Sequence, residues 1–253
     1  MAVTLALLHL ASWPGEVERN KSEIERAVRR AAALGARFAV TPELAVSGYG
    51  FRDVIGTDWI ARGQPALFAW AGVLARQESM FLALGTPEAE ALGGGLFNSI
   101  TVFAPDGRLV GRHRKINVLR VGSESWSAAG DRPAVVELAG LGRIGLFICA
   151  DMYSERLVAE TAAGDVDLLL SSAAWAPGLH GPDGEWERAS ATTGRPVLVC
   201  NRTGRDVLDF TAARSIAAVG GIVRHCHASV ESAIVLVDWD RQDRQLTGWR
   251  VFP

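Results

Sequence analysis

The sequence predicts an α/β fold that forms a single domain over residues 1–253. Short apolar runs typical of buried strands alternate along the chain with segments whose apolar residues recur at helical spacing. Hydrophobic residues make up 49% and charged residues 21% of the chain, which are values of a globular protein. No repeat, low-complexity linker or break in composition divides the chain, so one α/β domain is the simplest account.

The charge and the cysteine content limit the class of function. Lys and Arg number 26 and Asp and Glu 28, giving a net charge of −2, which argues against general binding to nucleic acid or anionic membranes. No stretch approaches the ~18 uninterrupted apolar residues of a membrane span. No Lys or Arg precedes Arg19, so a signal peptide is not expected. The three cysteines, Cys149, Cys200 and Cys226, suit a reducing cytoplasm better than a disulfide scaffold.

The N-terminal segment predicts one strand–helix–strand unit. Val3–Leu10 is an apolar run that Trp13-Pro14-Gly15 breaks. Val17–Leu34 follows as an amphipathic helix, and Gly35 ends it in the usual C-terminal manner. The apolar face of this helix is made by Ile24, Ala27, Val28, Ala31 and Ala32. Arg37–Thr41 is the next buried strand, with Pro42-Glu43-Leu44 at its end.

The same alternation continues through the rest of the chain. Helices are expected at Pro65–Gln77, Glu155–Ala163 and Glu185–Thr193. Strands are expected at Met80–Gly85, Asn98–Ala104, Leu109–Arg114, Pro133–Leu138, Arg143–Cys149, Val166–Ser171, Pro196–Asn201, Ser215–Val219 and Ser232–Asp238. Pro105-Asp106-Gly107 predicts a hairpin turn, because Pro fixes φ and Gly allows a positive φ.

Several motif-like segments have simpler interpretations. Gly140-Leu141-Gly142-Arg143-Ile144-Gly145 matches GxGxxG, but a strand follows it where a dinucleotide site needs a helix, so a turn is expected. Gly93-Gly94-Gly95 lacks the Lys of a phosphate loop and is expected to be a flexible connection. His225 and His227 could share a strand face, yet no second Cys/His pair lies nearby for zinc. The remaining histidines, His9, His113 and His180, are isolated in the sequence.

Three reactive side chains share one property: each follows the C-terminal end of an apolar strand. Cys149 closes the run Ile144–Ile148 and precedes a helix, where a nucleophilic thiolate of low pKa is plausible. Glu43 follows the strand Arg37–Thr41, and Lys115 follows Leu109–Arg114. One crevice could hold all three, as a nucleophile with a base and an oxyanion partner. Taken singly, Cys149 would be interpreted as a buried cysteine, Glu43 as a surface-loop carboxylate and Lys115 as part of a solvated basic edge.

Taken in order, these segments resemble the nitrilase superfamily of carbon–nitrogen hydrolases, over roughly Val3 to Asp238. GARFAVTPELAVSGYGF, FNSITVFAPDGRLVGRHRKINV and RIGLFICADMYSE resemble the three blocks of that family, and SSAAWAPG and CNRTG resemble segments after the nucleophile. Cys149-Ala150-Asp151 is more similar to the amidase and carbamoylase side of the family than to true nitrilases. Three such motifs in the right order and at the family's spacing are specific.

The resemblance implies a four-layer αββα sandwich with a Glu–Lys–Cys triad. Glu43 would be the general base, Lys115 the partner of the oxyanion and Cys149 the nucleophile. Glu124, with Gly130 after it, fits the family's second glutamate and would position substrate or water. The residues expected at the pocket wall are Trp126, Tyr153 and Trp175; ordinary core or dimer packing explains these aromatics equally well. Arg188 or Arg202 could bind a substrate carboxylate. The resemblance implies no cofactor and no metal.

The function implied is hydrolysis of a small amide to ammonia and a carboxylic acid through a cysteine thioester. The partner would be a small molecule, with no nucleic acid or membrane, and the protein would form a homodimer or larger homo-oligomer. A nitrile or N-carbamoyl hydrolase of the same fold remains open, as do a catalytically idle binding protein that keeps the fold and a zinc hydrolase using His225 and His227. A glutaminase domain is less favoured, because no synthetase region follows in the sequence.

Overall fold

Two β-sheets form the framework of the computed structural model, which describes residues 2–91, 94–119, 122–178 and 180–253. The first sheet has the order β13-β12-β1-β2-β3-β4-β5. Its strands are β1 (Val3–His9), β2 (Phe38–Val40), β3 (Phe81–Ala89), β4 (Leu96–Phe103), β5 (Leu109–Arg114), β12 (Ala233–Asp240) and β13 (Gln245–Phe252). The second sheet has the order β11-β10-β9-β8-β7-β6. Its strands are β6 (Ala134–Leu138), β7 (Gly142–Ile148), β8 (Leu168–Ala173), β9 (Val197–Asn201), β10 (Ser215–Val219) and β11 (Ile222–His227).

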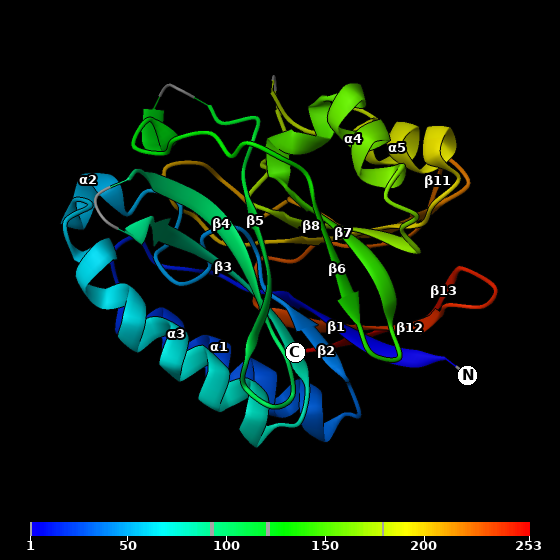
Figure 1. Cartoon of the computed structure of the whole chain (residues 1–253), viewed down its shortest axis with the longest axis horizontal. Coiled ribbons are helices and arrows are strands. Elements are labelled where there is room, and N and C mark those ends of the chain that lie inside the picture. The colour runs from blue at the N-terminus through cyan, green and yellow to red at the C-terminus, as the bar shows by residue number, and fades with distance from the viewer. Residues whose placement is uncertain (1, 92–93, 120–121, 179) are drawn as a thin grey trace.

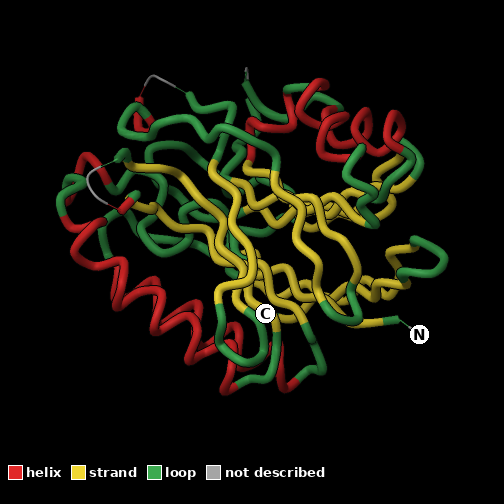
Figure 2. Tube along the Cα trace, in the orientation of Figure 1, coloured by secondary structure: helices red, strands yellow, loops and turns green. Residues whose placement is uncertain are grey.

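Helices cover the outer face of each sheet, so the layers run helix, sheet, sheet, helix (Figures 1 and 2). The first sheet carries α1 (Val17–Ala33) and α3 (Trp59–Gln77), and the second carries α4 (Glu155–Ala162) and α5 (Glu185–Thr193). A short helix, α2 (Arg52–Ile55), precedes α3, and 3₁₀ turns lie at Gly122–Glu124 and Cys149–Tyr153. The predicted four-layer αββα sandwich is confirmed.

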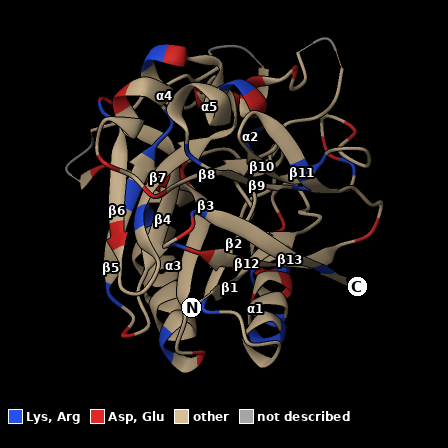
Figure 3. Ribbon diagram, turned by 90° about the vertical axis from the view of Figure 1, so that its right-hand side faces the viewer, with Lys and Arg blue, Asp and Glu red and all other residues tan. Residues whose placement is uncertain are grey.

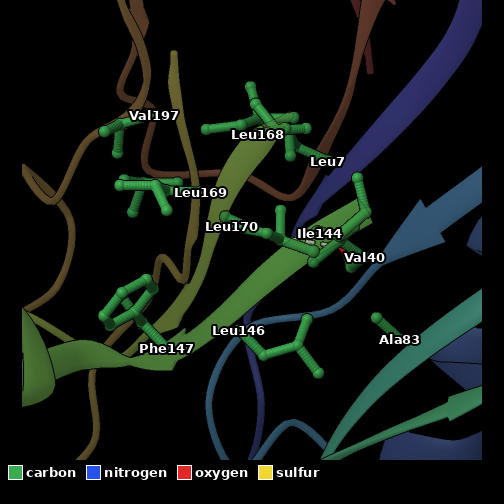
Figure 4. Close-up of a cluster of buried hydrophobic side chains, with 14 of the residues drawn as sticks. Leu7, Val40, Ala83, Ile144, Leu146, Phe147, Leu168, Leu169, Leu170 and Val197 are labelled. Carbon is green, nitrogen blue, oxygen red and sulfur yellow. Dashed lines mark hydrogen bonds between the residues drawn. The ribbon is translucent and has the colours of Figure 1, made fainter. Parts of the chain in front are cut away.

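The main core lies between the two sheets. Leu7, Val40 and Ala83 face it from the first sheet, and Ile144 and Leu170 face it from the second, all of them at most 1% exposed (Figure 4). Burying a Leu or Ile side chain is worth about 1.5–3 kcal/mol, so this layer supplies much of the driving force that holds the sheets face to face. The packed sheets therefore form a rigid framework for the residues at their strand ends.

The helix α1 shows the amphipathic pattern that the sequence predicts. Its residues Ile24, Val28 and Ala31 are buried against the first sheet. The opposite face carries ion pairs within the helix, such as Lys21 with Glu18 and Arg29 with Glu25. Figure 3 shows positions of both charge signs on this helix. Each exposed pair contributes only about 0.3–0.5 kcal/mol, so burial of the apolar face decides the position of this helix.

Some element boundaries differ from the prediction because tertiary contacts override local signals. The helix α3 begins at Trp59 and not at Pro65, since Ile60 is buried and the Trp59 ring packs edge-on against Phe51. The strand β13 was not predicted, because its mostly exposed side chains give no clear pattern; it forms because it pairs with β12. The segment around Gly140 is a turn between β6 and β7, as predicted.

Within the residues that the structure describes, no helix is long and apolar enough to cross a membrane. Of the expected glycine connection at residues 93–95, Gly93 lies outside the described residues.

Strand directions bring several strand ends to one edge of the sandwich. β2 is parallel to β3, and both β3–β4 and β4–β5 are antiparallel, so β5 runs in the direction of β2. In the second sheet β7, β8 and β9 are mutually parallel. Residues that follow β2 and β5 therefore lie at the same edge of their sheet, which is the arrangement that the strand-end argument requires.

Candidate active site

Glu43 lies three residues after the end of β2, on a tightly packed turn. Gly85 of β3 passes so close that a Cβ there would lie 2.1 Å from the carbonyl oxygen of Pro42. Oε2 of Glu43 accepts a hydrogen bond from the backbone N–H of Ala174 at the end of β8 (2.8 Å). The next residue, Leu44, has a positive φ of 51°, a conformation that side chains rarely adopt. The carboxylate is 1% exposed and tied to both sheets.

Lys115 follows β5 and is fully buried. Its backbone N–H donates to the carbonyl of Asn98 (2.8 Å), and its own carbonyl accepts from Gly130 (2.8 Å). Gly130 must be small, because a Cβ there would lie 2.3 Å from the carbonyl of Arg114. The ammonium group lies 2.8 Å from a carboxylate oxygen of Glu43 and 2.8 Å from one of Glu124. Lys115 therefore bridges two buried carboxylates.

Glu124, in the 3₁₀ turn Gly122–Glu124, is 1% exposed and completes this cluster. Its Oε2 also accepts from the backbone N–H of Leu119 (3.2 Å). Asn98, at the start of β4, donates from Nδ2 to Oε1 of Glu43 and to Oε1 of Glu124, both at 2.7 Å. The sequence analysis did not single out Asn98. The sequence contains one signal that could have indicated Asn98: it is a polar residue at the start of a buried strand, and that strand lies next to Lys115.

Cys149 directly follows β7 and begins the 3₁₀ turn Cys149–Tyr153. Its φ of +45° is unusual for a residue with a side chain, and the residue is 5% exposed. Burial, followed by the negative charge of Glu43, raises the pKa of the Cys149 thiol well above its ordinary value, although Lys115 acts in the opposite direction. The expectation of a thiol with a lowered pKa at this strand end is therefore wrong.

The charges of the cluster follow from burial and from the neighbouring groups. Burial lowers the pKa of Lys115, but Glu43, Cys149 and Glu124 outweigh it, and the pKa lies well above its ordinary value. Burial raises the pKa of Glu124; Lys115 opposes this, Glu43 adds to it, and the result lies above the ordinary value. The resting site thus combines a charged ammonium group, a protonated thiol and a carboxyl group at position 124 that ionises less readily than usual.

A second buried network joins the segments that carry Lys115 and Cys149. Asp151 accepts backbone hydrogen bonds from Ile116 (2.9 Å) and Ile148 (2.9 Å), and its Oδ2 lies 2.8 Å from Nε2 of His113. Although burial raises the pKa of Asp151, His113 and the backbone N–H groups of Asn117 and Ile148 lower it below its ordinary value. His113 is isolated in the sequence, and folding across 38 positions pairs it with Asp151.

The three aromatic residues predicted at the pocket wall occupy two places. The rings of Tyr153 and Trp175 lie edge-on with centroids 4.8 Å apart; Tyr153 closes the turn that begins at Cys149, and Trp175 lies just beyond β8. Trp126 is half-buried and packs edge-on against Phe51, at 5.1 Å between centroids. Their packing partners are therefore defined, and contact with substrate stays a prediction.

Tyr49 was not predicted, yet it lies beside the cluster. Its pKa is raised above the ordinary value, first by burial and then by the charge of Glu43, so the phenol stays neutral.

Asp206 accepts from the backbone N–H of Tyr49 (2.8 Å) and pairs with the buried Arg202 (2.8 Å). Arg188 pairs with Glu185 in the same way (2.8 Å). Both arginines considered for a substrate carboxylate thus already have carboxylate partners.

The histidine pair considered for zinc lies away from this cluster. On β11, His225 stacks on Trp249 and His227 lies edge-on to His9. Across the part of the chain that the structure describes, no group of three or more His, Cys, Asp or Glu side chains could hold a metal ion.

Comparison with known proteins gives a consistent picture. A family model described as carbon–nitrogen hydrolase matches residues 4–248. A chloroplastic omega-amidase of Arabidopsis thaliana is 29% identical over 170 residues, covering 62% of this chain and 45% of that protein. A nitrilase of Pyrococcus abyssi is 28% identical over 162 residues, covering 62% of this chain and 60% of the nitrilase. The matches thus span about half the length of these curated relatives.

Among solved structures, a variant amidase from Nesterenkonia sp. AN1 in complex with butyramide superposes with a TM-score of 0.81 at 22% identity, covering 96% of this chain and 94% of the amidase. Another structure of that amidase, with a TM-score of 0.82 at 21% identity, covers 96% of this chain and 92% of the amidase. In it the acetamide moiety of fluoroacetamide is covalently added at the active-site cysteine. At this level of identity the likeness shows the shared fold.

Proposed function

The chain belongs to the carbon–nitrogen hydrolase family, as its resemblance implied, and from that premise we propose that it hydrolyses small amides to ammonia and carboxylic acids through a thioester on Cys149. One observation carries the proposal. Glu43, Lys115 and Glu124 form a single buried hydrogen-bonded cluster, and the Cys149 thiol lies close enough for the Glu43 charge and hydrogen bonding to raise its pKa. A buried thiol, base and cation in one place fit acyl transfer better than a packing role.

In the first half of the proposed reaction, Glu43 accepts the proton of the Cys149 thiol as sulfur attacks the amide carbon. Since the pKa of the thiol is raised at rest, this proton transfer accompanies the attack and does not precede it. The new oxyanion receives hydrogen bonds from Lys115 and from the backbone N–H beside Cys149. The carbon–nitrogen bond then breaks, Glu43 returns its proton to nitrogen, and ammonia leaves a thioester behind.

In the second half, water attacks the thioester carbon. Glu43 takes a proton from this water, the carbon–sulfur bond breaks, and the proton passes to the sulfur of Cys149 as the carboxylic acid leaves. Glu124 holds Lys115 in place and orients substrate or water. Each proton removed is returned within the cycle, so the proposed steps balance with the cluster residues, the amide and water alone.

A substrate panel tests the reaction class. We expect ammonia release from acetamide, propionamide or butyramide, and less from the matching nitriles and from N-carbamoyl amino acids. The amidase likened to this chain binds butyramide, which favours short aliphatic amides in the panel. Preferential turnover of nitriles or carbamoyl compounds would move the chain to those branches, and no turnover of any member would leave a binding protein that keeps the fold.

Substitution of the cluster tests the residue roles. Cys149→Ala should abolish turnover and keep the melting temperature, whereas Cys226→Ala, at an exposed cysteine, should change neither. Glu43→Gln and Lys115→Ala should each lower kcat by at least about 100-fold, since removal of one preorganised group of this kind costs about that much. Fluoroacetamide should alkylate Cys149 in preference to Cys200 and Cys226, as read by peptide mass spectrometry. Wild-type turnover by Cys149→Ala would remove the nucleophile assignment.

The proposal also includes the oligomeric state and the cellular compartment of the protein. We expect a homodimer or larger homo-oligomer, which sedimentation of the purified chain would measure. The three cysteines are free, and two of them are buried, which fits a reducing cytoplasm.

A further inference from the structure

Asp151 connects the two segments that carry Lys115 and Cys149. It is fully buried, and its two oxygens together accept four hydrogen bonds. The donors are the backbone N–H groups of Ile116 (2.9 Å), Asn117 (2.8 Å) and Ile148 (2.9 Å) and Nε2 of His113 (2.8 Å). Three of these donors lie within two residues of Lys115, and the fourth immediately precedes Cys149. One carboxylate therefore fixes the backbone of both segments at once.

The turn at Cys149 needs such a constraint. Its φ of +45° is a left-handed conformation that costs energy for any residue with a Cβ, and it persists only when the surroundings hold it. A further bond joins the same two segments, from Nδ2 of Asn117 to the carbonyl of Ala150 (2.7 Å). The direction in which the thiol points thus depends on contacts made by the segment around Lys115.

His113 is the one side-chain donor among the four. A carboxylate that already accepts three backbone N–H groups can take only a donor as its fourth partner, so Nε2 of His113 carries the proton. That leaves Nδ1, which is buried and has no hydrogen-bond partner in the described part of the chain. An apolar side chain at position 113 would avoid that unpaired nitrogen. The free-energy cost of this unpaired nitrogen is explained if the hydrogen bond that His113 donates to Asp151 serves the site.

We propose that His113 is a positioning residue for the hydrolysis proposed above: by donating Nε2–H to Asp151, it holds the strained turn of Cys149 in register with Lys115. The inference rests on the proposed function for its effect on turnover. His113 touches neither the thiol nor the ammonium group in any contact described above, and it acts only through Asp151. Its contribution therefore lies in the orientation of the nucleophile and not in substrate binding.

Matched variants separate positioning from packing. His113→Leu fills the site but cannot donate, His113→Gln keeps an N–H donor, and His225→Leu is the control at a distant histidine that stacks on Trp249. We expect His113→Leu to lower kcat and the rate of Cys149 alkylation by iodoacetamide together, by about 10- to 100-fold, the usual effect of a small misplacement. KM should stay within about threefold, because the substrate contacts are not altered. His113→Gln should recover most of both rates.

The opposite results would overturn the inference. A packing role would lower the melting temperature of His113→Leu and leave kcat and alkylation of the folded protein at wild-type rates. Equal losses in His113→Leu and His113→Gln would show that the donor is irrelevant. If His113→Leu does not fold, His113→Asn replaces it, because its shorter side chain does not reach Asp151; rates equal to those of His113→Gln would then contradict positioning.

Alkylation also separates this inference from the proposed function, since it requires no turnover. If the wild-type protein hydrolyses no amide while His113→Leu still slows alkylation of Cys149, the proposed function fails and the positioning role stands. If the wild type is an amidase and alkylation is unaffected, the positioning role fails alone. Peptide mass spectrometry assigns the label to Cys149 and not to Cys200 or Cys226.

Discussion

The carboxylates of Glu43 and Glu124 share the same two hydrogen-bond donors. Nδ2 of Asn98 lies 2.7 Å from an oxygen of each, and Nζ of Lys115 lies 2.8 Å from an oxygen of each. With one cation between two buried carboxyl groups, full ionisation of both would leave an uncompensated negative charge, which is costly away from water. The raised pKa of Glu124 expresses this conflict, and the neutral donor Asn98 eases it without adding charge.

Asn98→Ala tests that arrangement. The substitution leaves two buried carboxylates with one donor fewer each, and an unsatisfied buried acceptor costs about 1–3 kcal/mol. If this loss falls on the reactive geometry, kcat should drop by about 10- to 100-fold, measured as ammonia release at saturating amide.

Two further variants serve as controls for Asn98→Ala, one at the next residue and one at Asn98 itself. Ser99→Ala removes a buried hydroxyl that has no hydrogen-bond partner in the described residues, so its kcat should stay near wild type. Asn98→Asp, similar in size but acidic, should be worse than Asn98→Ala, because it adds a third carboxylate. A wild-type rate in Asn98→Ala would show that Asn98 only fills space.

Glu124→Gln should change the pH dependence of stability. The pKa of Glu124 is raised above its ordinary 4.5 in the folded protein, first by burial, opposed by Lys115, and then by the charge of Glu43. A raised pKa in the folded state means that the group contributes most at low pH and that its contribution is lost as pH rises through the folded value. We therefore expect the melting temperature of Glu124→Gln, relative to wild type, to rise from pH 4.5 towards neutral pH.

Thermal melts at several pH values, followed by circular dichroism, measure this difference. A constant offset between variant and wild type would mean that position 124 titrates alike in the folded and unfolded chains. Activity gives a separate readout, because Gln can accept a hydrogen bond from Lys115 but cannot ionise.

Tyr153 and Trp175 should affect the choice of substrate more than the chemistry. Both donate to the carbonyl of His180, at 2.7 and 2.8 Å, so loss of one hydroxyl leaves the other bond in place. Tyr153→Phe should therefore change KM by less than about fivefold, since a single neutral hydrogen bond contributes about 1 kcal/mol or less here. Tyr153→Ala, which removes the ring, should raise kcat/KM for butyramide relative to acetamide.

The ratio of kcat/KM for the two amides is the informative measurement, because pocket size discriminates single methylene groups by about 10- to 200-fold at most. An unchanged ratio in Tyr153→Ala would place the ring outside the substrate pocket. Trp126→Ala is the second variant in which this ratio is measured, because Trp126 packs against Phe51, apart from the pair of Tyr153 and Trp175.

Glu43, Lys115 and Cys149 could be predicted as one cluster because each follows an apolar strand, and such positions can be counted from the sequence; their catalytic roles stay a proposal. Asn98 was missed because it opens a strand instead of closing one. β4 is antiparallel to β5, so its first residues lie at the edge where β5 ends. That relation depends on strand order, which local periodicity does not contain.

Longer-range pairings were also beyond sequence patterns. His113 and Asp151 are 38 residues apart, and neither has a neighbour that suggests the other. The raised pKa of Cys149 depends on burial and on the approach of Glu43, both of which arise only when the two sheets pack face to face. Helix boundaries failed for a similar reason at α3, where contacts of Ile60 and Trp59 extend the helix beyond the point that Pro65 suggested.

The Arg202–Asp206 pair should stabilise the loop that carries Tyr49. The side chain of Asp206 is fully buried, and it accepts from the backbone N–H groups of Tyr49 and Gly50 as well as from Arg202. Arg202→Met leaves that carboxylate buried without its cation, and breaking a buried pair from one side costs about 3–5 kcal/mol. Urea denaturation should show a loss of this size.

Arg205→Ala is the matched control, since Arg205 and Asp209 form an exposed pair at 3.2 Å whose loss should cost less than about 1 kcal/mol. Similar midpoints for Arg202→Met and Arg205→Ala would mean that water reaches Asp206 once the guanidinium group is gone.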